Sequence, residues 1–227
     1  MEKLYYLLFD EAERPGGALR DALIEKAAPA LRAAGARDIT VNVQDEAVAA
    51  GKPLRRSDPP IRASVAFWLE DSDDRGPCQQ VLAAHARRLA GYLVVESRPL
   101  RHAAPRGART EGTKQVTCIA KRPDLSYAEF TRIWHGDHKV VAVETQSTFG
   151  YVRNEIVRPL TEGAPAGWIA VVEENFPIGA LTDPKVFYAA ASDAELERNL
   201  KRMLDSCNRF LDMGPLEFTH MSEYWLG

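Results

Sequence analysis

The amino-acid sequence predicts an α+β protein whose chain contains the same unit twice, each unit with the element order β-α-β-β-α-β. Short apolar and aromatic runs recur along both halves, as strands require. Between them lie longer segments with apolar residues at helical spacing. The stretch 98–112 combines prolines and glycines with four arginines and shows no apolar period. We therefore divide the chain into repeat 1 (1–97), a linker (98–112) and repeat 2 (113–227).

Repeat 1 begins with an aromatic strand and closes with a shorter one. Its expected elements are a strand at 3–9, a helix at 18–34, strands at 38–43 and 61–69, a helix at 78–90 and a strand at 92–96. Pro29 lies inside the first helix and is expected to kink or split it, because proline cannot donate the backbone hydrogen bond. The polar segment 45–60 is expected to be a loop.

Repeat 2 follows the same order. Its expected elements are strands at 114–121, 149–158, 168–175 and 216–225, a helix at 126–146, and a helix that begins at 193 and ends at Gly214. The inward face of this last helix is assigned to Leu196, Leu200, Met203, Leu204, Cys207 and Leu211. The connection 176–192, like the loop 45–60, is long for a compact domain, so both are candidate lids.

Each unit would form a four-stranded antiparallel sheet with helices on one face only. The other face of each sheet would be bare, and packing the two bare faces together buries both. The sequence therefore predicts two tandem repeats packed sheet to sheet as an α+β barrel. Because the closure can occur within one chain, a homodimer is optional rather than required.

Composition excludes several functional classes. The net charge of −3 gives no basic face for nucleic acid. No apolar run approaches the ~20 residues needed to span a bilayer, and the first residues lack a signal-peptide pattern. The three cysteines are scattered and form no C-x-x-C pair, so neither a zinc site nor a disulfide framework is predicted. We expect a cytoplasmic protein that binds a small molecule and interacts with neither nucleic acid nor membrane.

The helix at 126–146 carries the most informative pattern. Ser126 and Glu129 form a predicted capping box. On a helical wheel, one stripe contains Tyr127, Phe130, Trp134, His138 and Val141. A histidine on a core-facing stripe is either a neutral core residue with one satisfied hydrogen bond or a catalytic acid/base beside a pocket.

This region resembles the EthD-domain family. The family segment R-P-D-L-S/T-x-x-E-F-x-x-x-W-x-x-x-H is matched at 122–138, and its G-Y-x-x-N strand is matched at 150–154. The resemblance implies a ferredoxin-like fold, a dimeric α+β barrel usually closed by two copies of the domain. It also assigns the motif histidine to His138.

Two departures from the family pattern shape the expectation for function. The family commonly has a proline soon after the motif histidine, where this chain has Lys139 and two valines. Repeat 1 lacks the W-x-x-x-H segment, so it is interpreted as a degenerate copy that only closes the barrel. We therefore expect one functional pocket, centred on repeat 2.

Candidate site residues are polar or aromatic side chains on otherwise apolar elements, expected to line a pocket in the barrel interior. His138 and Tyr151 are the candidate catalytic residues. The candidate substrate-binding residues are Trp134, Asn154, His220, Tyr224, Tyr6 and Trp68. Tyr151 and Asn154 lie on opposite faces of one strand, so at most one of them can line a given pocket unless a bulge intervenes. His102, in the linker, is expected to be solvated.

The residue types favour a cofactor-free lyase, isomerase or cyclase acting on a small aromatic or polyketide-like carbonyl compound. His138 would transfer the proton and a tyrosine hydroxyl would polarise the carbonyl. No cofactor and no metal site are predicted, although His135 and His138 are three residues apart. The alternatives are an oxygen- or haem-using oxidoreductase of the same barrel superfamily, with His138 or His220 as axial ligand, and a non-catalytic small-molecule-binding protein.

Overall fold

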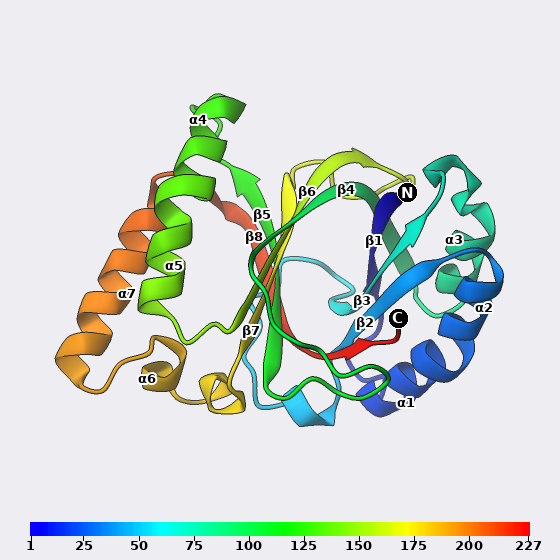
Figure 1. Ribbon diagram of the computed structural model, residues 1–227, viewed down its shortest axis with the longest axis horizontal. Helices are drawn as coiled ribbons and strands as arrows, with labels where there is room; N and C mark the ends of the chain where they lie inside the picture. Colours follow the sequence, from blue (N-terminus) through cyan, green and yellow to red (C-terminus); the bar gives the residue numbers. More distant parts are fainter.

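The computed structural model describes residues 1–227 and contains one closed eight-stranded barrel (Figure 1). The strands are β1 (Glu2–Phe9), β2 (Arg37–Val43), β3 (Ile61–Leu69), β4 (Arg88–Leu100), β5 (Thr113–Lys121), β6 (Gly150–Pro159), β7 (Ala170–Phe176) and β8 (Leu211–Trp225). Around the barrel they follow the order β1-β3-β2-β8-β5-β7-β6-β4. All neighbouring pairs are antiparallel.

The prediction of an α+β barrel from tandem repeats is confirmed. Each repeat supplies four consecutive positions of the barrel, β4-β1-β3-β2 from the first half and β8-β5-β7-β6 from the second. The two sheets join edge to edge, because β2 pairs with β8 and β4 pairs with β6. Closure therefore satisfies the edge strands by hydrogen bonds as well as burying the inner faces.

The helices form two outer layers, one on each side of the barrel (Figure 1). Repeat 1 carries α1 (Gly16–Asp21), η1 (Ala22–Ala27), α2 (Ala28–Ala33), η2 (Glu46–Val48), η3 (Ser72–Arg75) and α3 (Gly76–Ala83). Repeat 2 carries α4 (Tyr127–Thr131), η4 (Arg132–His138), α5 (Lys139–Thr145), η5 (Ile178–Leu181), α6 (Pro184–Phe187) and α7 (Asp193–Asn208). None of these helices has the length and apolar content that crossing a membrane requires.

Both first helices contain a π-helical segment, η1 in repeat 1 and η4 in repeat 2. The segment η1 ends two residues before Pro29, and the helix continues beyond the proline. A wider π turn at this point accommodates the ring, which would otherwise clash with the carbonyl four residues earlier. Pro29 therefore widens the helix locally and does not split it.

The capping box of Ser126 and Glu129 is present as predicted. Beyond it, η4 changes the register of the helix, because a π turn contains more residues than an α turn. Phe130, Trp134 and His138, four residues apart, are buried, whereas Tyr127 is 53% exposed. After the π segment, Ala142 takes the buried place expected of Val141, whereas Tyr127 is exposed because it lies in the first turn of α4, ahead of that segment.

Two helix predictions were too long, and in both cases strand pairing replaces the helix. The helix at 78–90 ends at Ala83, and residues from Arg88 join β4, where they pair with β1. The last helix ends at Asn208, and Leu211 pairs with Lys121 in the barrel. Leu200 and Leu204, both expected to face inward, are 36% and 45% exposed.

The segment 98–112 is partly incorporated into the barrel. Its first residues complete β4, and single bridges then tie Arg106 and Arg109 to the end of β8. His102 in this segment is not solvated as expected: its side chain is 13% exposed and contacts Glu223. The backbone of Gly150 approaches so closely that an added Cβ would lie 2.4 Å from His102 Nδ1, which explains the glycine of the G-Y-x-x-N segment.

Candidate functional site

A cavity of about 350 Å³ lies in repeat 2, between the outer face of the sheet and the helices. Strands β5 to β8 form its floor, and η4 and α7 form its roof. Most of its lining is apolar, including the side chains of Trp134, Met203, Phe210 and Leu216. This is the size and character of a small-molecule site.

Four polar side chains cross the floor of this cavity in one row. In the strand pairing, Tyr151 on β6 lies opposite Glu174 on β7, Glu174 lies opposite Gln115 on β5, and Gln115 lies opposite His220 on β8. Directly paired residues share a face of the sheet, with Cβ atoms ~5 Å apart. All four line the cavity.

Glu174 is the most unusual member of the row. Burial raises the pKa of its carboxyl from 4.5 to about 7, and no cation or hydrogen-bond donor offsets this shift. Its charge also contributes, after burial, to raising the pKa of Cys207, a roof residue, to about 12. Glu174 therefore extends from the floor toward the roof as a carboxyl that changes protonation near neutral pH.

Tyr151 is held in place by a residue of the helical segment η4. Trp134 Nε1 donates a hydrogen bond to the Tyr151 hydroxyl at 2.9 Å. Because the oxygen is the acceptor in this contact, the phenolic proton remains free to be donated. Burial raises the pKa of Tyr151, so the phenol stays neutral and can serve as a donor beside Glu174.

His138 and His220 lie on opposite walls of the cavity, His138 in the roof and His220 in the floor. Burial lowers the pKa of each imidazole from 6.5 to about 4, so both are neutral at pH 7. His138 Nδ1 is 3.0 Å from Ser206 Oγ, and its ring packs on Phe210 with centroids 4.7 Å apart. His220 Nδ1 is buried without a partner.

Both long loops reach the mouth of the cavity. Lys52 comes from the loop 45–60 of repeat 1, and Leu181, Phe187 and Tyr188 come from the connection 176–192. The same residues line an adjoining hollow of about 390 Å³. Gly51 packs so closely that an added Cβ would lie 2.9 Å from both His220 and Leu181. Repeat 1 thus contributes a loop to the site of repeat 2.

The structure brings together four of the predicted site residues: Trp134, His138, Tyr151 and His220. The expectation that they would meet in the barrel interior was wrong. The face of β6 that carries Tyr151 is turned toward the helices, so their cavity lies outside the barrel wall.

The other predicted residues lie elsewhere. Asn154 is in the barrel interior, where it donates to Glu173, and Trp68 lines the barrel mouth. Tyr6 stacks on Phe67 in the core of repeat 1. The Tyr224 hydroxyl donates to Asp45 at 3.0 Å.

Glu174 and Gln115 were missed at the level of sequence. Glu174 stands in the run Val-Val-Glu-Glu-Asn, where two adjacent glutamates on a strand must face opposite sides. One of the two therefore had to face the helices and the other the barrel interior. The alternation of side chains along the strand was therefore the signal in the sequence that could have identified a buried glutamate on the helix side.

The side chains of this cavity determine whether it could hold a metal ion or a haem. Nowhere do three His, Cys, Asp or Glu side chains gather so that they could hold a metal ion. A haem iron would need His138 or His220 as its axial ligand. The two haem carboxylates, however, would meet only one cavity-lining cation, Lys52, while the floor carries the carboxyl of Glu174. The residues of this cavity therefore do not fit haem.

Comparison with known proteins defines the class of fold. No family model matches the sequence, and no curated protein matches it either. An anthrone oxidase-like protein of known structure covers 100% of this chain and 93% of its own, at 9% sequence identity and a TM-score of 0.58. A chlorite dismutase-like protein covers 97% of this chain and 95% of its own, at 11% identity and a TM-score of 0.51. The chain has the fold of the dimeric α+β barrel proteins.

Proposed function

We propose that the protein is a cofactor-free oxidoreductase that binds a flat aromatic or polyketide-like carbonyl compound and oxidises it with O₂ after removing a proton. One observation carries this proposal: Glu174, with a pKa of about 7, stands without a partner in an apolar, aromatic-lined cavity. A general base is most effective when its pKa lies near the working pH.

The first step is proton abstraction from a CH₂ group beside the carbonyl. Glu174 takes the proton, and the electron pair moves onto the carbonyl oxygen to give an enolate. Tyr151, directly opposite Glu174 in the sheet, donates its free phenolic proton in a hydrogen bond to this oxygen. The base and the oxyanion donor are thus held by neighbouring strands of one rigid sheet.

The second step uses O₂ alone. The enolate carbon bonds to O₂, and the proton held by Glu174 completes a hydroperoxide. His138 takes the remaining proton from this carbon, the O–O bond breaks, and the departing hydroxide takes that proton from His138 and leaves as water. In balance, CH₂ and O₂ give C=O and H₂O, and the four electrons come from the substrate carbon. No external reductant is required. The anthrone oxidase-like and chlorite dismutase-like neighbours favour this oxidative fate.

A lyase, isomerase or cyclase is the second candidate. It would form the same enolate and return the proton to a different atom. Two neutral histidines on opposite walls, His138 and His220, support this fate because each could return a proton from its own side. Membership of the EthD family, which rests on the segments 122–138 and 150–154, is compatible with both candidates.

The test is O₂ consumption with anthrone and a small panel of related aromatic ketones. We expect one equivalent of O₂ consumed per carbonyl formed, with Glu174→Gln lowering turnover by about 100-fold or more. Glu155→Gln is the matched control, because Glu155 lies on the same sheet and contacts Tyr127 outside the cavity. Product without O₂ uptake would support the second candidate. Tight binding with no conversion of any compound would make the protein a binding module.

A further inference from the structure

A second cavity, of about 380 Å³, opens at one end of the barrel. It is lined by side chains from all eight strands, together with the start of the segment 98–112. It is separate from the cavity of Glu174, since the two share no lining residue. The rest of the barrel interior is filled by apolar side chains such as Leu7, Phe9 and Met221.

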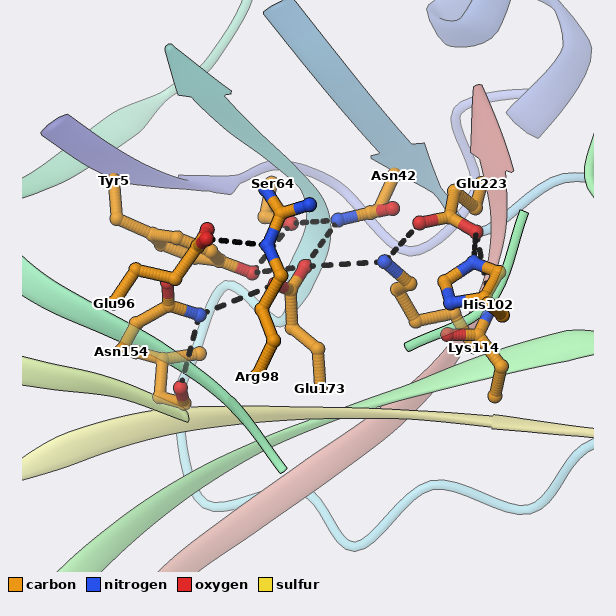
Figure 2. Close-up of polar contacts among 12 residues, drawn as sticks. Tyr5, Asn42, Ser64, Glu96, Arg98, His102, Lys114, Asn154, Glu173 and Glu223 are labelled. Atoms are coloured by element: carbon orange, nitrogen blue, oxygen red, sulfur yellow. Dashed lines mark hydrogen bonds and ion pairs between the residues drawn. The ribbon is translucent and has the colours of Figure 1, made fainter. Parts of the chain in front are cut away.

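The inner wall of this cavity is a network of buried charges (Figure 2). Lys3 donates a hydrogen bond to Glu96, and Lys114 donates one to Glu223. The Nζ atom of Lys114 also lies 3.6 Å from Glu173 Oε1. Burial would raise the pKa of Glu223, but Lys114 and His102 lower it below its usual value. These charges are costly to bury, and their pairing keeps them ionised.

The network uses its carboxylate oxygens fully but leaves other polar groups without a partner. Every carboxylate oxygen of Glu96, Glu173 and Glu223 already accepts at least one hydrogen bond. The donors are Lys3, Arg98, Tyr5, Asn42, Asn154, Lys114, His102 and Asn175. By contrast, Arg98 uses only Nε, toward Glu96, and Arg101 makes no hydrogen bond or ion pair. The free cationic donors at the mouth are therefore the terminal guanidinium N–H groups of Arg98 and the guanidinium of Arg101.

Apolar side chains form part of the lining of the same cavity. Trp68 and Trp225 both line the cavity, together with Leu100 and Val152. Asp38, the remaining acid of the lining, accepts a hydrogen bond from Trp225 Nε1 at 2.5 Å. A ligand here meets indole surfaces along its body and free guanidinium groups at one end.

We infer that the barrel mouth is a binding site for a small aromatic carboxylate. Its carboxylate is held by Arg98 and Arg101, and its ring lies among Trp68, Trp225 and Leu100. This site is independent of the proposed oxidation, because it shares neither residues nor chemistry with the Glu174 cavity.

Benzoate and indole-3-acetate are the probes, titrated into the full-length protein by calorimetry and by tryptophan fluorescence. We expect one site per chain, with benzyl alcohol, the neutral analogue, binding at least tenfold more weakly than benzoate. Arg101→Gln is the central variant, since Arg101 has no partner whose loss could disturb folding. This substitution should weaken the binding of benzoate by about tenfold, which is the expected cost of losing one charge-assisted contact. Arg132→Gln, on the outer helix layer, and Tyr151→Phe, in the other cavity, should bind benzoate as the unaltered protein does.

Four results would overturn the inference. Equal affinity for benzoate and benzyl alcohol would remove the anionic requirement. Unchanged affinity in both Arg101→Gln and Arg98→Gln, or a loss in Tyr151→Phe, would place the ligand elsewhere. Absence of saturable binding by either acid at millimolar concentration would mean that the network only stabilises the barrel.

Discussion

The two repeats share their order of elements and a π-helical turn in the first helix, yet they differ in what lies between helices and sheet. In repeat 1 this space is filled by a cluster of 21 buried apolar residues, to which repeat 2 contributes Leu160, Tyr224 and Leu226, against 10 in the corresponding cluster of repeat 2. Tyr6 illustrates the filled layer, with its ring stacked 5.6 Å from Phe67. Tyr151 in repeat 2 instead borders the cavity beside Glu174. One fold therefore supports a packed layer in one half and a site in the other.

The π turns differ in cause as well. In repeat 1 the turn precedes Pro29, where it relieves a steric conflict. In repeat 2 no proline is present, and the turn carries Trp134 and His138 over the cavity. A π turn without a local steric cause is often found at a functional site. The same backbone irregularity is thus structural in one repeat and part of the site in the other.

The largest expected effect tests the difference in packing. Tyr6→Ala should lower the free energy of unfolding by about 3–5 kcal/mol, because it empties a fully packed position. Tyr151→Ala should cost less, roughly 1–3 kcal/mol, because its ring already borders empty space. Urea unfolding of both variants measures the difference. Equal losses would mean that the two layers are packed alike.

The next effect concerns pH. Because burial raises the pKa of Glu174 from 4.5 to about 7, the folded protein binds more protons than the unfolded chain between these values. This group therefore lowers stability as pH rises from 4.5 to 7, by about 3 kcal/mol in total. His138 and His220 act in the opposite direction: their pKa values fall from 6.5 to about 4, so they raise stability as pH rises from 4 to 6.5.

Glu174→Gln separates these contributions. The variant should gain stability relative to the unaltered protein as pH increases to 7 and beyond, while the histidine-dependent rise from pH 4 to 6.5 becomes steeper. Unfolding free energies measured at several pH values provide the check. Parallel curves for the two proteins would contradict a raised pKa at Glu174.

The smallest expected effect concerns the loop that repeat 1 contributes. Gly51→Ala should displace His220 or Leu181, at a cost of about 1–3 kcal/mol, and should reduce turnover more than stability alone explains. Gly167→Ala is the matched control, since nothing lies within 4 Å of its added Cβ. If the two alanine variants behaved alike, the loop of repeat 1 would have no part in the site.

By itself the sequence determined the repeat, the strand alternation, the capping box and the placement of Trp134 and His138 on one helix face. These features depend on local periodicity and short-range hydrogen bonds, which the order of residues specifies directly. The helix ends near 83 and 208 were not predictable in this way, because Arg88 and Leu211 gain partners only from strands distant in sequence.

The site itself was decided by tertiary structure. Alternation along β6 required Tyr151 and Asn154 to lie on opposite faces of the strand. It did not determine which of them would face the helices. Glu174 became the central residue only because closure of the barrel directed it away from the interior and left it without a partner among apolar side chains. Its neighbour Glu173 acquired the buried donors Tyr5, Asn42 and Asn154 instead. Adjacent and chemically identical in the sequence, the two glutamates differ because burial and pairing depend on residues that only the closed fold brings together.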